Sequence, residues 1–115
     1  MAYTTIDNPT LHFSCTIYTG NAADDRAVTI DGTGMAPDLL WIKNRDEAEH
    51  GKLGDTVRGI NEVLVPSDTD SASSSSSYTN ISSATSDGFT VSKGGVDGAV
   101  NKNSIKYVAW SWLAG

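Results

Sequence analysis

Short runs of alternating apolar and polar residues, each closed by a cluster of turn-forming residues, constrain this 115-residue chain more than any other feature. The clearest run is 13–19, FSCTIYT, where Phe13, Cys15 and Ile17 share one face. Alternation with a period of two is typical of a half-buried β-strand, and the chain has no long amphipathic helical pattern. Short strands separated by turns indicate a sandwich or barrel. The sequence therefore predicts an all-β fold, a single antiparallel β-sandwich with long polar loops.

Four further runs predict strands, at 26–30, 39–43, 89–91 and 104–113. The run 39–43 is apolar on both faces until its last residue, which favours a central strand packed on both sides. The last run is too apolar to be left as an open edge, so we expect it to pair on both sides. Large aromatic side chains should supply much of the core. The predicted core residues are Trp41, Phe89, Trp110 and Trp112.

Two segments are harder to interpret. Residues 53–65 carry a helical stripe, but Gly54 and Gly59 weaken a helix by about 1 kcal/mol each. We therefore expect two short strands, near 56–58 and 61–65, with a bend or bulge at Gly59. Residues 78–85 alternate weakly and suggest an outer strand.

The chain divides into a short arm and one domain. Residues 1–12 are polar and suggest an N-terminal arm, and residues 13–115 suggest the sandwich. Thirteen of the 23 residues in 66–88 are Ser or Thr, a composition that buries little surface and cannot repay its ordering entropy. We therefore predict a mobile surface loop at about 66–77.

Charge and cysteine content argue against several classes of protein. The formal net charge is -6 and the sequence pI is about 4.5. Nucleic-acid binding and docking on anionic lipid both require a basic face, so the sequence predicts neither. The single cysteine excludes an internal disulfide. The chain has no apolar run near the roughly 20 residues that span a bilayer and no signal-peptide pattern at its N-terminus.

Motifs for catalysis are weak. The chain has no nucleophile motif and no glycine-rich phosphate loop. We interpret Cys15 as a small buried hydrophobe and His50 as an ordinary loop residue. The carboxylate clusters lie in turns, where solvated side chains are the usual case, although the Asp68-x-Asp70 pair leaves a calcium site as an alternative. The sequence therefore predicts no enzyme, no cofactor and no metal.

One ion pair can be proposed from the sequence. Arg58 follows Asp55 at a spacing that lets the two side chains pair and tie a loop to the sandwich. The alternative is an ordinary exposed arginine.

Five blocks of the chain together resemble a module that is common in virion proteins of marine tailed phages and cyanophages. The blocks are YTGN with DDRAV (18–28), APDLLWIKNRD (36–46), DTVRG (55–59), SDGFTV (86–91) and YVAWSWLAG (107–115). In that family the module often lies inside tail or fibre proteins, with a lectin-like β-sandwich suspected. For the fold, the resemblance implies a jelly-roll or a concanavalin-like or SPRY-like sandwich.

For function, the resemblance implies a non-enzymatic structural protein of the virion, which is assembled in the cytoplasm of the bacterial host. A chain holding one module suggests a capsid decoration (cement) protein, bound in many copies to the major capsid protein or another virion protein. We expect a homo-oligomer, a trimer or another small assembly, because assembly stabilises a small core by mass action. The alternative is a tail-fibre or head-fibre adhesin that binds host glycan, with Tyr18 and Tyr78 as ligand contacts.

Overall fold

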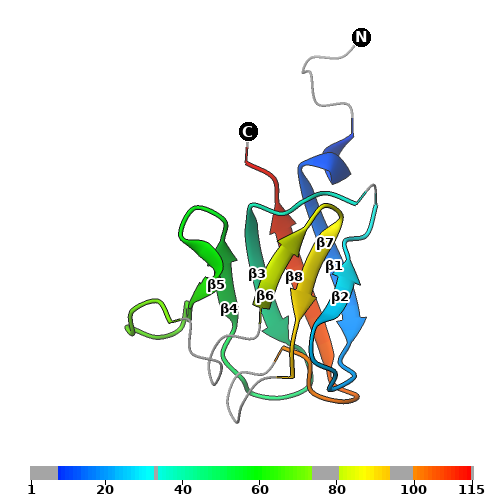
Figure 1. Cartoon of the computed structure of the whole chain (residues 1–115). Helices are drawn as coiled ribbons and strands as arrows, with labels where there is room; N and C mark the ends of the chain where they lie inside the picture. The colour runs from blue at the N-terminus through cyan, green and yellow to red at the C-terminus, as the bar shows by residue number, and fades with distance from the viewer. Residues whose placement is uncertain (1–7, 33, 74–80, 94–99, 115) are drawn as a thin grey trace.

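The computed structural model describes residues 8–32, 34–73, 81–93 and 100–114, whose strands form two antiparallel sheets packed face to face (Figure 1). A short 3-10 helix, η1 (Pro9–Leu11), precedes the strands. The sheets have the order β1-β8-β3-β4-β5 and β2-β7-β6. The antiparallel β-sandwich predicted from the alternation is confirmed. The strands are β1 (Phe13–Thr19), β2 (Arg26–Thr29), β3 (Leu39–Asn44), β4 (Lys52–Asp55), β5 (Gly59–Leu64), β6 (Ile81–Thr85), β7 (Gly88–Val91) and β8 (Lys106–Trp112).

The last strand lies inside its sheet, as predicted. β8 pairs with β1 on one side and with β3 on the other, so Trp110 lies opposite both Cys15 and Trp41. An apolar strand in this position has no open backbone edge. β6 lies at the edge of the three-stranded sheet, which confirms the outer strand for the described part of 78–85.

The strand predicted near 56–58 is wrong. β4 ends at Asp55, residues 56–58 form a turn, and β5 begins at Gly59. Gly59 has a φ of 109°, a conformation that side chains with a Cβ disfavour, so the glycine completes a hairpin turn. Val57 lies at the tip of this turn and is 95% exposed, because a turn residue has no strand face to bury.

The core contains mostly aliphatic side chains and two tyrosines. Phe89 is fully buried, as predicted. Trp41 is 38% exposed, and Trp110 and Trp112 are only half-buried, so these three tryptophans lie outside the buried cluster and their prediction as core is corrected. The buried cluster is Tyr18, Val28, Ile30, Met35, Leu40, Ile42, Ile60, Val63, Ile81, Phe89, Val91, Val100, Tyr107 and Ala109.

The first strand is turned over relative to the prediction. Cys15 is exposed rather than buried, and Phe13 and Ile17 are exposed with it. The inward side chains are Ser14, Thr16 and Tyr18, which alternate with them along β1. The apolar face of this strand therefore points away from the core.

Hydrogen bonds to one turn explain why the hydroxyl face of β1 is inside. Ser14 Oγ donates to the carbonyl oxygen of Asp31 at 2.7 Å, and the N–H of Asp31 donates to Thr16 Oγ1 at 2.9 Å. The chain at Asp31 therefore covers the inner side of β1 with backbone groups that need polar partners. Hydrogen bonds to such partners offset the free-energy cost of removing a hydroxyl from water. An apolar side chain there would leave the backbone groups unpaired.

Tyr18 belongs to the core and is not a surface ligand contact. Its ring stacks on Tyr107, with ring centroids 5.2 Å apart, and its hydroxyl donates to the carbonyl oxygen of Val100 at 2.7 Å. Burial raises the pKa of Tyr18 well above its ordinary value. The predicted contact at Tyr78, like residues 1–7 of the arm and 74–77 of the serine-rich loop, lies outside the described residues. In the described part of that loop, residues 66–71 are exposed.

Candidate functional site

The five-stranded sheet turns an apolar surface away from the core. Cross-strand pairing aligns its outward side chains in rows, and one row runs from Cys15 through Trp110 and Trp41 to Leu53 and Leu64, across all five strands. We call this surface the outer face. It consists of Phe13, Cys15, Ile17, Leu39, Trp41, Leu53, Leu64, Val108, Trp110 and Trp112.

Aromatic contacts order the outer face without covering it. Phe13 packs against Trp112 with ring centroids 5.1 Å apart, and Trp41 packs against Trp110 at 5.5 Å. Ile17 remains 59% exposed, and Phe13 41% exposed. A soluble monomer rarely exposes a contiguous apolar patch of more than a few hundred Å², and larger patches mark interaction sites.

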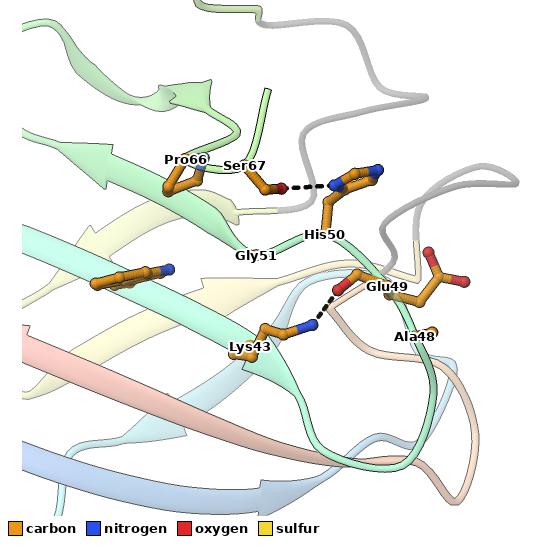
Figure 2. A pocket seen from close by; sticks show the side chains of 8 residues that line it. Lys43, Ala48, Glu49, His50, Gly51, Pro66 and Ser67 are labelled. Atoms are coloured by element: carbon orange, nitrogen blue, oxygen red, sulfur yellow. Dashed lines mark hydrogen bonds between the residues drawn. The ribbon is translucent and has the colours of Figure 1, made fainter. Parts of the chain in front are cut away.

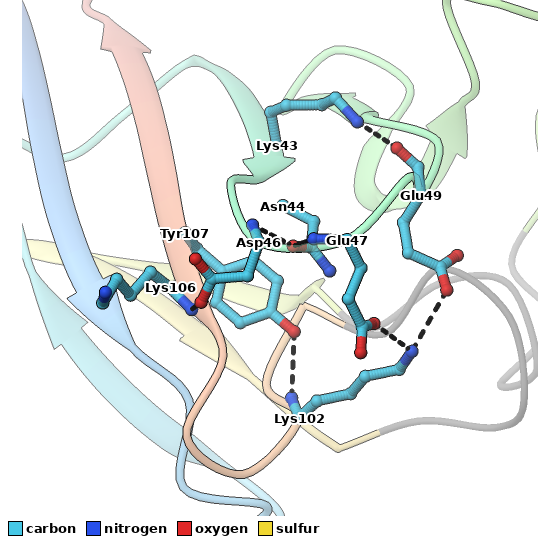
Figure 3. Close-up of polar contacts among 8 residues, drawn as sticks. All are labelled: Lys43, Asn44, Asp46, Glu47, Glu49, Lys102, Lys106 and Tyr107. Atoms are coloured by element: carbon cyan, nitrogen blue, oxygen red, sulfur yellow. Dashed lines mark hydrogen bonds and ion pairs between the residues drawn. The ribbon is translucent and has the colours of Figure 1, made fainter.

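Positive charge borders one end of the outer face. Lys43 and Lys106 continue the outward alternation of β3 and β8, and Arg45 follows β3 directly. Asp46 lies beside Lys106, and its carboxylate accepts a hydrogen bond from the N–H of that residue (Figure 3). Lys43, Arg45, Lys106 and Asp46 thus lie at this end, and the carboxylates that follow in the same loop, Glu47 and Glu49, pair with Lys102.

A polar network ties the loop after β3 to the loop before β8 (Figure 3). Lys102 Nζ pairs with Glu47 at 2.8 Å and with Glu49 at 3.1 Å. Hydrogen bonds to Glu47, and then to Glu49, raise the pKa of Lys102. The N–H of Lys102 donates to the hydroxyl of the buried Tyr107, so the network is anchored in the core. Asn44 organises the loop itself, because its Oδ1 accepts from the N–H groups of the two residues at 46 and 47.

The predicted ion pair at the hairpin turn is confirmed. Arg58 Nη2 and Nε each lie 2.6 Å from Asp55 Oδ2, and the N–H of Arg58 donates to Asp55 Oδ1 at 2.8 Å. These bonds, the one from the N–H of Arg58 above all, lower the pKa of Asp55. The pair closes the β4–β5 turn.

A pocket of about 370 Å³ opens beside Trp41 (Figure 2). It is lined by Trp41, Lys43, Ala48, Glu49, His50, Gly51, Pro66 and Ser67. This pocket cannot be predicted from the sequence, because the loop after β3 and the residues after β5 come together only in the folded chain. The two segments are joined by a contact of 2.6 Å between His50 Nδ1 and Ser67 Oγ.

The His50–Ser67 contact has the length expected of a base and a nucleophile. Both side chains are exposed, however, whereas a hydrolytic pair works in a site that excludes water. We therefore interpret this contact as a link between two loops, in line with the expectation for His50. Among the described residues, which include Asp68 and Asp70, no group of three or more His, Cys, Asp or Glu side chains could hold a metal ion.

The site as a whole is an apolar sheet surface with a charged border and an adjoining pocket. The chain belongs to the family described as a domain of unknown function, DUF7483, whose model matches residues 8–115. No curated protein and no solved structure matches the chain. In the described parts of the fold, no helix has the length and apolar character needed to cross a membrane.

Proposed function

We propose that this protein is a non-enzymatic structural component of a phage virion. In this proposal it is a capsid decoration protein that binds the major capsid protein, or another virion protein, in many copies. The resemblance of the five sequence blocks to phage virion modules motivates the virion setting. The observation that carries the binding role is the outer face, an apolar surface crossing all five strands of one sheet.

The energetics favour a protein as the occupant of the outer face. Fully burying a large apolar side chain contributes about 1.5–3 kcal/mol, and four outer-face residues are exposed: Phe13, Cys15, Ile17 and Trp41. Association costs several kcal/mol of lost freedom, so one such contact gives modest affinity. Many copies held side by side on a repeating lattice raise the effective affinity.

The border charges specify the partner surface. Lys43, Arg45 and Lys106 lie at one end of the outer face, so the complementary surface is apolar with carboxylates beside it. Charge complementarity of this kind sets orientation and association rate. If two copies of the chain met through their outer faces, the cations of one copy would face either the same cations or the apolar end of the other. Neither arrangement supplies a matching set of carboxylates, so we favour a different virion protein as the occupant.

Intact virions of the phage that encodes the chain provide the test. Quantitative gels and imaging should show several hundred copies on the capsid surface. A count of a few tens, or a position on the tail, would contradict the decoration role. Sedimentation of the purified chain reports whether the outer face instead binds a second copy.

A matched pair of variants tests the outer face itself. Ile17→Lys places a charge on an exposed residue of the outer face, and Ala27→Lys places one on an exposed residue of the other sheet. Both positions are exposed, so both variants should fold. We expect Ile17→Lys to lose binding to stripped capsids and Ala27→Lys to retain it; equal binding of the two would contradict the proposal.

A further inference from the structure

The pocket beside Trp41 has the make-up of a small-ligand site. Its volume of about 370 Å³ lies at the lower end of the range for such sites. Trp41, Ala48 and Pro66 contribute apolar lining, and His50 and Ser67 contribute polar groups that can form hydrogen bonds. An apolar wall with a few polar groups is the usual composition of a pocket that orients its ligand.

Gly51 lets the pocket form against the indole. A Cβ added at Gly51 would come within 2.9 Å of Trp41 Nε1, so a larger residue would push the loop away from the ring. With glycine there, the nitrogen edge of Trp41 packs closely on the loop while 38% of the residue stays exposed. The exposed indole is thus held in place as a surface for an apolar part of a ligand.

The charged groups that line the pocket are already held by bonds within the protein. Lys43 Nζ donates to the backbone carbonyl of Glu49, and the Glu49 carboxylate pairs with Lys102 Nζ at 3.1 Å (Figures 2 and 3). A phosphate would have to draw Lys43 away from this carbonyl, and an ammonium ligand would have to compete with Lys102 for the Glu49 carboxylate. His50 Nδ1 and Ser67 Oγ bond to each other at 2.6 Å, but the second ring nitrogen of His50 and the further hydrogen-bonding capacity of the hydroxyl suit an uncharged ligand carrying hydroxyl groups.

We propose that this pocket binds a neutral sugar ring. A pyranose has a face of C–H groups, which would stack on Trp41, and a rim of hydroxyl groups, which would bond to His50 and Ser67. The predicted glycan contact at Tyr18 is buried, so the sugar site is placed on residues that the sequence analysis did not assign. This inference does not depend on the virion role; because Trp41 belongs both to the outer face and to the pocket, a sugar and a protein partner would compete for its ring.

The direct test uses the purified chain and a panel of uncharged methyl glycosides of glucose, galactose, mannose and N-acetylglucosamine. Ligand-detected saturation-transfer NMR and tryptophan fluorescence, both at millimolar sugar, report binding. We expect at least one glycoside to bind. A pull-down with a neutral bacterial surface polysaccharide then shows whether the sugar is recognised within a polymer or only when free. Absence of binding by all four glycosides and by the polysaccharide would overturn the proposal.

Variants locate the binding. Ser67→Ala removes one hydrogen bond and should weaken affinity about tenfold, the equivalent of about 1.4 kcal/mol. Ser71→Ala, an exposed serine in the same loop that does not line this pocket, should leave affinity unchanged. Trp41→Ala should abolish binding. If that variant does not fold, Trp41→Phe, which keeps a smaller ring, should weaken it. Binding that survives both Ser67→Ala and the Trp41 substitution would show that the sugar binds elsewhere and would overturn the assignment.

Discussion

The indole rings of Trp41 and Trp110 meet on the outward side of the five-stranded sheet, with ring centroids 5.5 Å apart and planes inclined at 58°. They lie directly opposite each other on β3 and β8. A cross-strand aromatic pair stabilises a sheet by about 0.5–1.5 kcal/mol beyond area burial. The opposite side of the sheet supplies the core, so these rings remain available to a partner.

Because Trp41 lies outside the core, its substitution should lower stability less than the substitution of a buried core ring. Phe89→Ala removes a fully buried ring and should lower the free energy of unfolding by about 3–5 kcal/mol. Trp41→Ala removes a larger ring that is 38% exposed, and the loss should be about 1–2 kcal/mol. Urea unfolding followed by circular dichroism measures both values. Equal losses would show that Trp41 contributes to the core after all.

The thiol of Cys15 reports whether the outer face is covered. Cys15 is the chain's one cysteine and is exposed, so it should react with a maleimide in the folded monomer nearly as fast as in urea. On assembled particles the same thiol should be protected. Cys15→Ser provides the unlabelled control. A folded monomer that resists labelling would contradict the orientation of β1.

The inward hydroxyls of β1 give a second test of its orientation. Thr16→Val keeps the side-chain shape but removes the acceptor for the N–H of Asp31, leaving a polar group unpaired. We expect a loss of about 1–3 kcal/mol in the free energy of unfolding. Ile17→Thr makes the reverse change at the neighbouring outward position and should cost less than Thr16→Val. Thermal melts of the two variants would show the opposite ranking if β1 were turned the other way.

The Asp55–Arg58 pair predicts a pH dependence confined to acid. The folded-state pKa of Asp55 is lowered, chiefly by the N–H of Arg58, so its contribution is complete above the ordinary pKa of about 3.9 and is lost as pH falls through the lower folded value. Because the pair is partly exposed, Asp55→Asn should cost less than about 1 kcal/mol at pH 7. Urea unfolding at pH 7, 4 and 3 should show this difference shrinking with acid. Asp24→Asn, at an exposed loop aspartate, should show little difference at pH 7.

Local features of the sequence were sufficient for several elements. The alternation of 13–19 predicts β1 with its observed bounds, because a strand's period of two is a property of the backbone. The spacing of Asp55 and Arg58 predicts their pair, because both residues belong to one turn. The apolar character of 104–113 predicts a strand with two neighbours, because such a strand cannot remain an open edge.

Which face of a strand points toward the core could not be predicted in the same way. Two-residue alternation separates Phe13, Cys15 and Ile17 from Ser14 and Thr16, but it does not say which set faces inward. Hydrophobicity predicted that the first set would face the core. The second set faces inward in the structure, because the hydroxyls of Ser14 and Thr16 bond to the backbone of Asp31. The run 39–43, apolar on both faces, predicts a strand packed on both sides; β3 does have a neighbour on each edge, but only the face of Leu40 and Ile42 is buried, and Trp41 on the other face is exposed.

The sequence by itself determined where most of the strands lie, which residues share a face and that Asp55 pairs with Arg58, because these depend on backbone periodicity and on neighbours a few residues away; it missed β4 and the turn at 56–58. Only the tertiary structure decided which face became the core and that the segments at 48–51 and 66–67 enclose a pocket beside Trp41. The reason is that burial depends on partners far away in the chain. A hydroxyl beside Asp31 can be buried at little cost, and the Trp41 indole stays partly in solvent because it points away from the second sheet.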